Sequence, residues 1–432
     1  MSFRTYLERL KQEDRIQAIT GLISKEFECA AALKAFEPQP VLFTHINGFE
    51  IPVIGNLFCS KKSFGDYFDI PTSRIIPFLT DAITNPQPCG QTTSPPCQEV
   101  ILDKPNLDAL PILKHFESDG GPYITSGIVI AKHPEHGQNM DFHRCMQISR
   151  NQMAMRVVRG RHFSTYLDEL GQVDIALCIG NAPNVLAAAA ISVNIEDDEL
   201  GIANALEPLL TTKAQSVDLI IPADTEIVIE GTVFRDQRRS EGPFVDLTET
   251  HDIIRQEPLF EVRCITHRNN PIYQALLPGS LEHKLLMGMP REPTIFRAVN
   301  NVVICLDVNI NPGGCSWLHA IVKIDKQNDD DGKLAIEAAF AGHSSCKHVY
   351  VVDSDIDIYN PIDVEWAMAT RFQGHKDLVL KDREPGSSLD PSAETGSKLT
   401  TKMGFDLTAP LGAQRHAYTR VAYPPIDLTK YA

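Results

Sequence analysis

Apolar residues recur at helical spacing from the first positions of the chain. In MSFRTYLERLKQEDR, Phe3, Tyr6, Leu7 and Leu10 fall on one face, which predicts an amphipathic helix. A second helix is predicted near residues 26–35. Two apolar runs follow, VLFTHI and IPVIGNLF, and the pair Asn47-Gly48 between them is typical of a tight hairpin turn. This part, residues 1–105, is therefore expected to be a mixed α/β domain.

The pattern changes to successive strands in the middle of the chain, residues 106–298. Strand-like runs at 123–131 (YITSGIVIA), 140–149 and 153–158 are joined by the short polar segments HPEHGQ and RNQ. Such hairpins predict an antiparallel meander within a barrel or sandwich. Further strands are predicted at 174–179, 217–221 and 226–233, and helices at 162–170 and 199–206.

From about residue 300 the pattern alternates between strand and helix. Strands are predicted at 302–308, 317–324 and 348–352, with helices at 332–340 and 364–372, which indicates a small α/β domain over residues 299–432. The tail after Arg383 is rich in Ser, Pro, Gly and Thr. We expect it to lie on the surface and not to form a core.

Composition narrows the class of protein. A chain of 432 residues is longer than one hydrophobic core usually supports, so two or three domains are expected. With 43% apolar and 22% charged residues it is typical of a globular protein, and no apolar run approaches the roughly 20 residues that span a bilayer. The N-terminus lacks the apolar core of a signal peptide, so a cytoplasmic location is expected.

The charge and the cysteines exclude several functions. A net charge of -16 argues against nucleic acid or an anionic membrane as partner, because both require clustered positive charge. The ten cysteines are scattered singly, and the closest pair is Cys89 and Cys97. This spacing is typical of free thiols and not of a zinc site or a disulfide framework.

Six polar residues stand out as candidates for chemistry. An amide oxygen, an imidazole and a carboxylate can ligate one metal ion, while an arginine and two further acids supply an ion pair and a proton. The six are Asn139, Arg144, His162, Glu199, Glu241 and Asp246.

Each of these residues also has a simpler interpretation. Asn139 suits a turn, His162 suits the start of a helix, and Glu199 follows two acids that complement a helix dipole. Arg144 alternates onto the face of its apolar strand neighbours, which indicates a partner anion or a snorkelling side chain. Glu241 precedes Gly242-Pro243, a stiff turn that suits either a structural role or a firmly placed general acid.

Other motifs give weaker signals. The segment HPEH holds two imidazoles three residues apart, but its proline breaks the helix that would place them on one metal ion. The run at 353–357 (DSDID) resembles the start of a calcium loop without the required Gly and Glu, so a solvated strand end is expected. Walker, GxGxxG, GxSxG and HExxH motifs are absent from the sequence, which argues against NTPases, nicotinamide enzymes, serine hydrolases and zincins.

Seven segments in order resemble the UbiD family of reversible decarboxylases, which use prenylated FMN. These segments are YITSGIVI with NMDFHR, RHF, DDELGIANAL, PADTEIVIEGTV with EGPFVD, LPGSLEHKLLMGMP, DIDIYNPIDVEWAMATRFQ and KMGFD. The resemblance extends over essentially the whole chain. It implies an α+β fold with an N-terminal α/β domain, a central split β-barrel like that of flavin reductases, and a C-terminal α/β domain that mediates dimerisation.

The resemblance also implies roles for particular residues. Asn139, His162 and Glu199 match the ligands of a divalent ion, Mn²⁺ or Mg²⁺, that binds the cofactor phosphate, and a K⁺ ion is typical nearby. Arg144, Glu241 and Asp246 match the catalytic arginine, the proton-donating carboxyl and the third acid of the network. Lys402, in the C-terminal tail, matches a lysine that contacts the cofactor phosphate. Arg161 stands where some members carry Gln and is a further cofactor contact.

The substrate implied is an α,β-unsaturated acid. The length of the chain is similar to that of the subgroup whose members convert trans-anhydromevalonate 5-phosphate to isopentenyl phosphate in a modified mevalonate pathway. Aromatic or heteroaromatic acids are the alternative, and a non-catalytic flavin-binding subunit is a third possibility. A phosphorylated substrate requires cationic groups, for which the candidates, equally interpretable as surface charges, are Arg156, Arg159, His283 and Lys284. A flavin prenyltransferase that supplies the cofactor, and a homodimer or higher homo-oligomer, are also implied.

Overall fold

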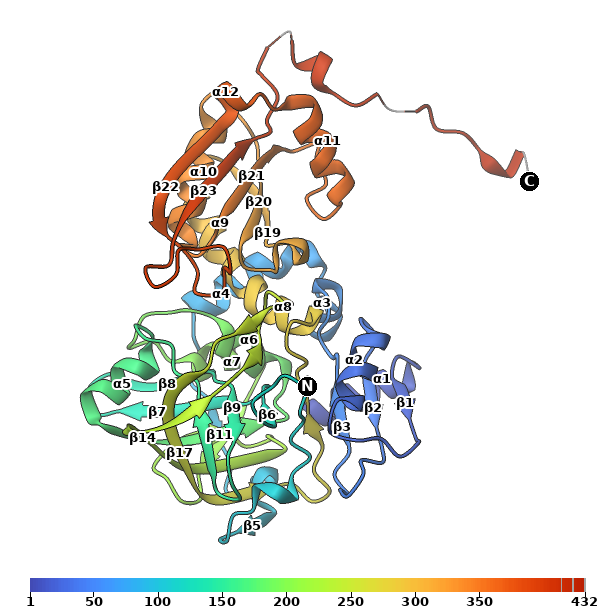
Figure 1. The fold of residues 1–432 in the computed structure, drawn as a ribbon. Helices are drawn as coiled ribbons and strands as arrows, with labels where there is room; N and C mark the ends of the chain where they lie inside the picture. Colours follow the sequence, from blue (N-terminus) through green and yellow to red (C-terminus); the bar gives the residue numbers. More distant parts are fainter. Residues whose placement is uncertain (413, 422, 431–432) are drawn as a thin grey trace. The chain divides into compact units, whose positions relative to one another are not determined.

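A nine-stranded sheet forms the centre of the first of two units into which the computed structural model divides. This unit contains residues 1–293, 315–317 and 389–391, and the second contains the remainder (Figure 1). The structure describes residues 1–412, 414–421 and 423–430. The sheet has the order β6 (Tyr123–Ile124), β9 (Cys145–Gln147), β10 (Gln152–Met155), β17 (Arg255–His267), β14 (Ile227–Glu241), β11 (Gln172–Ile179), β7 (Ile128–His133) and β8 (Gly137–Phe142), with β5 (Val100–Leu102) paired to β17.

Strands of this sheet separate two hydrophobic cores. In β7, Ile128 and Ile130 belong to one core, while Val129 and Ala131 belong to the other. Successive side chains of a strand point to opposite faces, so a strand covered on both faces needs a continuous apolar run. This requirement explains the sequence GIVIA, which does not alternate between apolar and polar residues.

The predicted hairpins form, but the predicted meander is not continuous. β7 pairs with β8 and β9 pairs with β10, both antiparallel, whereas β8 and β9 are not neighbours in the sheet. The predicted strand 140–149 is broken at His143 and Arg144, which lie between β8 and β9. The expectation that Arg144 lies within one regular strand was therefore wrong, because the chain leaves one edge of the sheet there and joins another part of it.

Helices and short strands surround the sheet. α1 (Phe3–Gln12) buries the four apolar residues of its predicted face, and the side chain of Ser2 caps its first turn by accepting from the Thr5 amide. The predicted hairpin around Asn47-Gly48 is confirmed, since β2 (Val41–Phe43) and β3 (Val53–Gly55) pair antiparallel. They form a four-stranded sheet with β1 (Gln17–Ile19) and β18 (Tyr273–Gln274).

The remaining elements of the first unit are helices and short sheets. The helices are α2 (Glu28–Phe36), α3 (Lys61–Phe68), α4 (Ile75–Thr84), α5 (His162–Leu170), α6 (Pro183–Ala190), α7 (Glu199–Leu206) and α8 (Leu281–Gly288). The short strands are β4 (Gly90–Gln91), β12 (Leu210–Lys213), β13 (Ile220–Pro222), β15 (Phe244–Val245) and β16 (His251–Asp252). The predicted helices at 162–170 and 199–206 are thus confirmed.

The second unit is a five-stranded sheet with helices, so the predicted α+β class is confirmed. The strand order is β19 (Cys305–Asn309), β20 (His319–Ile324), β21 (His348–Asp353), β23 (Leu399–Asp406) and β22 (Leu378–Pro385). The helices are α9 (Glu292–Asn300), which begins in the first unit, α10 (Asp331–Gly342), α11 (Pro361–Arg371) and α12 (Gly374–Asp377). α10 packs against β20, β21 and β23.

Two expectations for the second unit were wrong in whole or in part. The tail after Arg383 was expected to lie on the surface, yet β23 occupies an interior position of the sheet and Phe405 and Leu407 join its core. The acidic run at 353–357 was expected to be solvated, and Asp355 and Asp357 are exposed, but Asp353 is fully buried and forms an ion pair with Arg371 at 3.1 Å. Both errors arose because local polarity does not reveal which partners the fold supplies.

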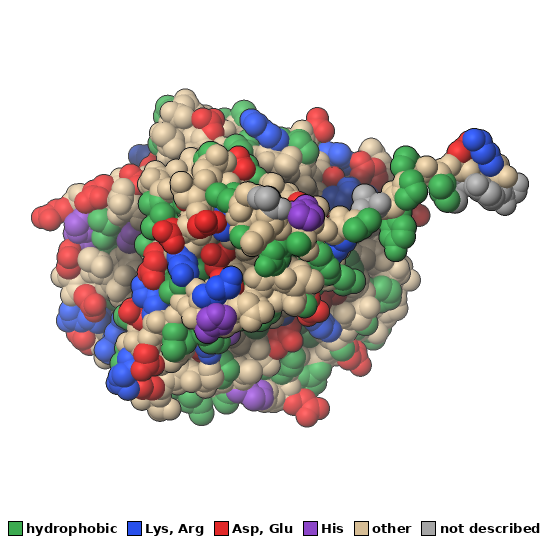
Figure 2. All heavy atoms as spheres, turned by 90° about the horizontal axis from the view of Figure 1, so that it is seen from above, with side chains coloured by type: hydrophobic (Ala, Val, Ile, Leu, Met, Phe, Trp, Pro, Cys, Tyr) green, Lys and Arg blue, Asp and Glu red, His purple; other side chains and the backbone are tan. Residues whose placement is uncertain are grey.

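The exposed surface carries charges of both signs. On the face that Figure 2 draws, acidic and basic side chains are interspersed. Across the described residues, none of the helices is both long and apolar enough to cross a bilayer.

Candidate active site

Three side chains from separate elements of the first unit meet at the edge strand β8. Asn139 lies in β8, and its Oδ1 is 3.1 Å from Nδ1 of His162, the first residue of α5. Glu199 is the first residue of α7, and its Oε2 accepts a hydrogen bond from the Met140 amide at 3.1 Å. The amide, the imidazole and the carboxylate that the sequence singled out are therefore brought together around one point of the backbone.

The helix starts explain how two of these side chains are placed. Gly160, with φ +76°, provides the turn that leads into α5, so His162 projects from the first helical position. Asp198 caps α7 by accepting from the Leu200 amide at 3.0 Å, which fixes Glu199 next to it. The turn at Gly160 and the Asp198 cap thus fix where the two helices begin.

The electrostatics of this group favour a bound cation. Burial raises the pKa of Glu199 to about 8, with a further contribution from the charge of Asp141. Burial also lowers the pKa of His162 and keeps the ring neutral, the form that binds metals. In the described part of the chain, Nδ2 of the buried Asn139 has no hydrogen-bond partner. Two ligands of one octahedral ion at about 2.1 Å lie about 3 Å apart, which matches the spacing of Asn139 and His162.

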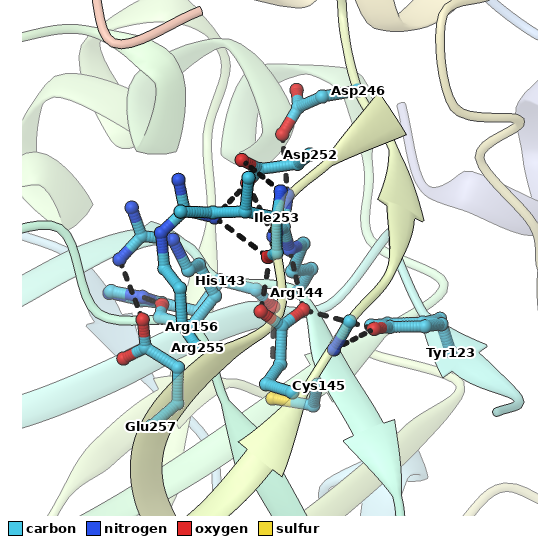
Figure 3. A network of polar contacts seen from close by, with 12 residues as sticks. Tyr123, His143, Arg144, Cys145, Arg156, Asp246, Asp252, Ile253, Arg255 and Glu257 are labelled. Carbon is cyan, nitrogen blue, oxygen red and sulfur yellow. Dashed lines mark hydrogen bonds and ion pairs between the residues drawn. The ribbon is translucent and has the colours of Figure 1, made fainter. Parts of the chain in front are cut away.

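Arg144 is the centre of a second group, which Figure 3 shows from close by. Its Nε donates to Oε1 of Glu241 at 2.8 Å and its Nη2 donates to Oε2 at 3.1 Å, a bidentate pair. Its Nη1 donates to Oδ2 of Asp246 at 2.5 Å. Burial alone would lower the pKa of the Arg144 guanidinium. The surrounding carboxylates have the larger effect and raise this pKa above its ordinary value. The arginine is therefore held as a cation between the two acids predicted from the sequence.

A third carboxylate, which sequence reasoning missed, also binds Arg144. Asp252, in β16, accepts from Nη2 of Arg144 at 2.9 Å and pairs through the same oxygen with Arg255. Burial works against ionisation of this carboxyl, but the two guanidinium groups lower its pKa. β15 and β16 form a two-stranded hairpin that returns Asp252 to Arg144. The local sequence HDII carried no signal of this pairing.

Two aromatic side chains contact Glu241 and Arg144 in this network. The hydroxyl of Tyr123 donates to Oε1 of Glu241 at 3.0 Å and accepts from the Gly242 amide at 3.0 Å. The ring of Phe244 lies 4.6 Å from the ring of Tyr123 and 4.3 Å from the guanidinium carbon of Arg144. Glu241 has no exposed surface. A carboxyl so placed is held rigidly and shielded from water.

The two other predicted cofactor contacts belong to different units. Arg161 precedes α5 and is exposed. Lys402 lies in β23 of the second unit, where it is buried and its Nζ donates to the carbonyl of Ser344. Burial lowers the pKa of Lys402.

Two of the four suggested phosphate contacts have acidic partners. Arg156 pairs with Glu257 at 2.8 Å, and Lys284 pairs with Glu249 at 2.6 Å. Arg159 is exposed. Nδ1 of His283 accepts from the Gly279 amide at 3.1 Å.

The two imidazoles of HPEH do come together, although the proline precludes a helix. The rings of His133 and His136 stack at 4.6 Å, and their Nε2 atoms lie 3.1 and 3.6 Å from Oε2 of Glu169. Nδ1 of His133 accepts from the amides of Glu135 and His136, so Nε2 carries the ring hydrogen. The two rings are stacked 27° from parallel, so their planes do not converge on one ion, and both imidazoles lie beside Glu169 of α5.

Sequence profiles of one family cover most of the chain. Residues 7–83, 90–281 and 284–407 match the N-terminal, Rift-related and C-terminal domains of 3-octaprenyl-4-hydroxybenzoate carboxy-lyase. An anhydromevalonate phosphate decarboxylase of Methanothermobacter thermautotrophicus is 38% identical over 427 residues, which is 97% of this chain and 99% of that protein. One of Methanocaldococcus jannaschii is 39% identical over 407 residues, 93% of this chain and 96% of that protein.

Solved structures agree with the sequence comparison. The UbiD-class enzyme HmfF from Pelotomaculum thermopropionicum, solved in complex with FMN, superposes with a TM-score of 0.96 at 34% identity over 100% of both chains. A vanillic acid decarboxylase of Sedimentibacter hydroxybenzoicus in its closed form gives a TM-score of 0.84 at 25% identity, covering 100% of this chain and 97% of that one. The chain belongs to the UbiD family of carboxy-lyases.

Proposed function

We propose that this protein decarboxylates trans-anhydromevalonate 5-phosphate to isopentenyl phosphate with prenylated FMN as cofactor. The arrangement that carries the proposal is the fully buried Glu241, held in a bidentate pair by Arg144. Loss of carbon dioxide leaves a carbon that needs one proton, and this carboxyl is placed to give it. Relatives named for this activity match the chain over nearly its whole length.

The metal that anchors the cofactor phosphate would be held by Asn139, His162 and Glu199. An oxygen and imidazole ligand set suits Mn²⁺ or Mg²⁺ better than a thiophilic metal. The buried Glu199 and the 3.1 Å spacing between Asn139 and His162 fit such an ion. Arg161 and Lys402 are proposed as further cofactor contacts, and a K⁺ ion is proposed nearby.

The cofactor supplies the electrophilic chemistry, and the protein positions the acid and moves the proton. In this scheme, Arg144 binds the substrate carboxylate beside Glu241, so that the leaving carboxylate and the proton donor are in register. Asp246 balances the charge of Arg144 as Glu241 changes its protonation state. Tyr123 fixes the orientation of Glu241 through its hydroxyl. Burial of Glu241 excludes water that could exchange protons with the carboxyl.

The substrate phosphate requires a cationic partner that is still available. Because Arg156 and Lys284 already form ion pairs, a phosphate would bind them only in competition with Glu257 and Glu249. Of the other two candidates, Arg159 is exposed and charged, whereas Nδ1 of His283 accepts from the Gly279 amide and the ring is neutral.

An aromatic or heteroaromatic acid is the second candidate substrate. The vanillic acid decarboxylase that shares the fold at 25% identity favours it. We further propose that the protein acts as a homodimer or higher homo-oligomer, because a solved relative, an evolved form of HmfF, is described as dimeric. A flavin prenyltransferase would supply the cofactor.

The test is turnover by the protein loaded with prenylated FMN through co-expression with a flavin prenyltransferase. Anhydromevalonate phosphate should be consumed with release of carbon dioxide, and a panel of benzoates and cinnamates should not. Preferential turnover of an aromatic acid would replace the proposed substrate. A loaded protein that is inert toward every acid would favour a non-catalytic subunit.

A further inference from the structure

Arg144 is more fully occupied than an arginine that only positions one acid. It makes four hydrogen bonds to three carboxylates: two to Glu241, one to Asp246 and one to Asp252. A substrate carboxylate that binds this guanidinium must therefore share or displace one of the protein's own carboxylates.

The three carboxylates differ in the hydrogen-bond donors that they have in addition to Arg144. Glu241 accepts from Tyr123, and Asp246 accepts from the Leu247 amide, so both have neutral donors. Asp252 alone among the three has a second guanidinium, that of Arg255, on the oxygen that also faces Arg144. Asp252 can therefore leave Arg144 and remain paired with a cation.

The geometry around Asp252 suits such a movement. Its Oδ1 accepts from the Ile253 amide at 2.9 Å, and its Oδ2 is already bonded to Arg255. Departure from Arg144 thus breaks one of three interactions and keeps two. The side chains of Asp252 and Arg255 retain 15% and 19% exposure, whereas that of Glu241 has none. In Figure 3, Asp252, Ile253 and Arg255 lie around one side of Arg144.

The charge balance gives a reason for the movement. Two guanidinium groups and three carboxylates leave the cluster one negative charge in excess when all three acids are ionised. A substrate carboxylate would add another negative charge in a buried setting, where repulsion between like charges is strong. Transfer of Asp252 from Arg144 to Arg255 removes one carboxylate from the binding position as another arrives.

We propose that Asp252 is a place-holder for the substrate carboxylate and that Arg255 receives it when the acid binds. The inference rests on the proposed function, in which Arg144 binds the carboxylate of the substrate. Asp252 and Arg255 are positioning residues in this scheme, since neither takes part in the loss of carbon dioxide. They set how easily an acid gains access to Arg144.

The experiment is a double-mutant cycle on the cofactor-loaded enzyme. Isothermal titration calorimetry measures the dissociation constant of 3-methyl-5-phosphooxypentanoate, the saturated counterpart of the proposed substrate, which cannot be decarboxylated. Asp252→Asn removes the carboxylate that competes for Arg144. The dissociation constant should fall about fivefold, because Arg144 is then free to bind the ligand in a larger fraction of the molecules. Arg255→Gln leaves Asp252 with Arg144 as its only cation and should raise the constant about fivefold.

The double variant separates this mechanism from simple electrostatics. If Arg255 acts through Asp252, Arg255→Gln has no effect in the Asp252→Asn background, so the two changes are strongly non-additive. If each charge merely attracts or repels the ligand, the effect of Arg255→Gln persists there unchanged, and the place-holder is refuted. Asp218→Asn, an exposed acid paired with Lys132, is the matched control and should bind like the wild type.

Kinetics provide an independent readout. Asp252→Asn should lower KM with kcat changed less than about twofold, whereas a merely structural role would lower kcat. Circular dichroism melts confirm that each variant is folded, and Arg255→Met replaces Arg255→Gln in the cycle if the latter does not fold. If the wild type neither binds the analogue nor turns over the substrate, the proposed function fails. If it does both while the cycle is additive, only the place-holder fails.

Discussion

Tyr123 and Glu241, 118 positions apart in the sequence, meet at a hydrogen bond of 3.0 Å in which the phenol donates to the carboxylate. The same hydroxyl accepts from the amide of Gly242, so it fixes the side chain and the backbone of the turn together. With Arg144 on the other side, the carboxylate receives three hydrogen bonds. Its position is thus decided by two segments that the sequence alone does not connect.

Replacing Tyr123 by Phe should slow decarboxylation without preventing cofactor binding. The ring is retained, so its packing on Phe244 survives, but Glu241 and the Gly242 amide lose a partner. A hydrogen bond to a charged group contributes about 1.5–3 kcal/mol, which corresponds to a fall in kcat of about ten- to a hundredfold. Steady-state kinetics across a pH series measure it, and a kcat equal to that of the wild type would show that the hydroxyl does not position the acid.

Glu241→Gln should abolish turnover and leave the spectrum of the bound flavin intact. Gln has nearly the same volume but cannot deliver a proton, and general acid catalysis contributes about 10²–10⁴-fold. Glu135→Gln, at an exposed position in the turn between β7 and β8, is the matched control. Carbon dioxide release and the absorbance spectrum test both parts. Substantial residual turnover by Glu241→Gln would mean that another group supplies the proton.

Gly120→Ala should inactivate the enzyme by moving the turn that holds Glu241. A Cβ at Gly120 would lie 2.2 Å from the carbonyl oxygen of Gly242, so the backbone there must shift. The neighbouring Gly121→Ala is a close control, because its Cβ would meet the flexible Met146 side chain at 3.3 Å. A misplacement near 1 Å lowers a rate about a hundredfold, so kcat should separate the two variants while both retain the bound flavin. Equal activity of both would refute this account of the turn.

Removing the metal should release the flavin. Chelation with EDTA, or the substitution His162→Ala, takes away the cation that would bind the cofactor phosphate, and metal affinity should fall by more than about tenfold. Elemental analysis for manganese and absorbance of the protein-bound flavin are the measurements. His136→Ala, which alters an imidazole outside the proposed ligand set, should retain both. Full flavin content after complete loss of metal would contradict the proposed anchoring.

The buried His115 predicts loss of stability in mild acid. Burial lowers its pKa to about 3, so the folded protein keeps the ring neutral where the unfolded chain, with a pKa of 6.5, binds a proton. The stability from this group is therefore complete above pH 6.5 and decreases as the pH falls toward 3. Between pH 6 and pH 5 the loss is about 1 kcal/mol.

Urea unfolding of the wild type and of His115→Asn at these two pH values tests the sign. The carboxyl of Asp119, 3.8 Å from the ring, has a raised pKa and faces it from the same loop. The variant should show less acid sensitivity by about the same 1 kcal/mol, whereas His45→Asn, at an exposed position, should not. An identical pH dependence of wild type and His115→Asn would refute the assignment.

The local sequence determined many of the elements, because their signals are short-range. Helical spacing of apolar residues predicted α1, and the run that begins at His162 predicted α5 with the limits that are observed. Asn47-Gly48 predicted the hairpin of β2 and β3, because a turn that needs a positive φ favours glycine locally, and Gly48 has φ +82°. Ordered motifs also indicated the family, and the comparisons agree.

Several acidic partners of basic residues were decided only by the tertiary structure. Asp252 reaches Arg144 through a hairpin, Glu257 reaches Arg156 across the sheet, and Asp353 is buried by Arg371. A polar residue has the same local appearance whether it is solvated or paired. The fold decides between these states, because burial and the distance to an opposite charge depend on segments far apart in the chain.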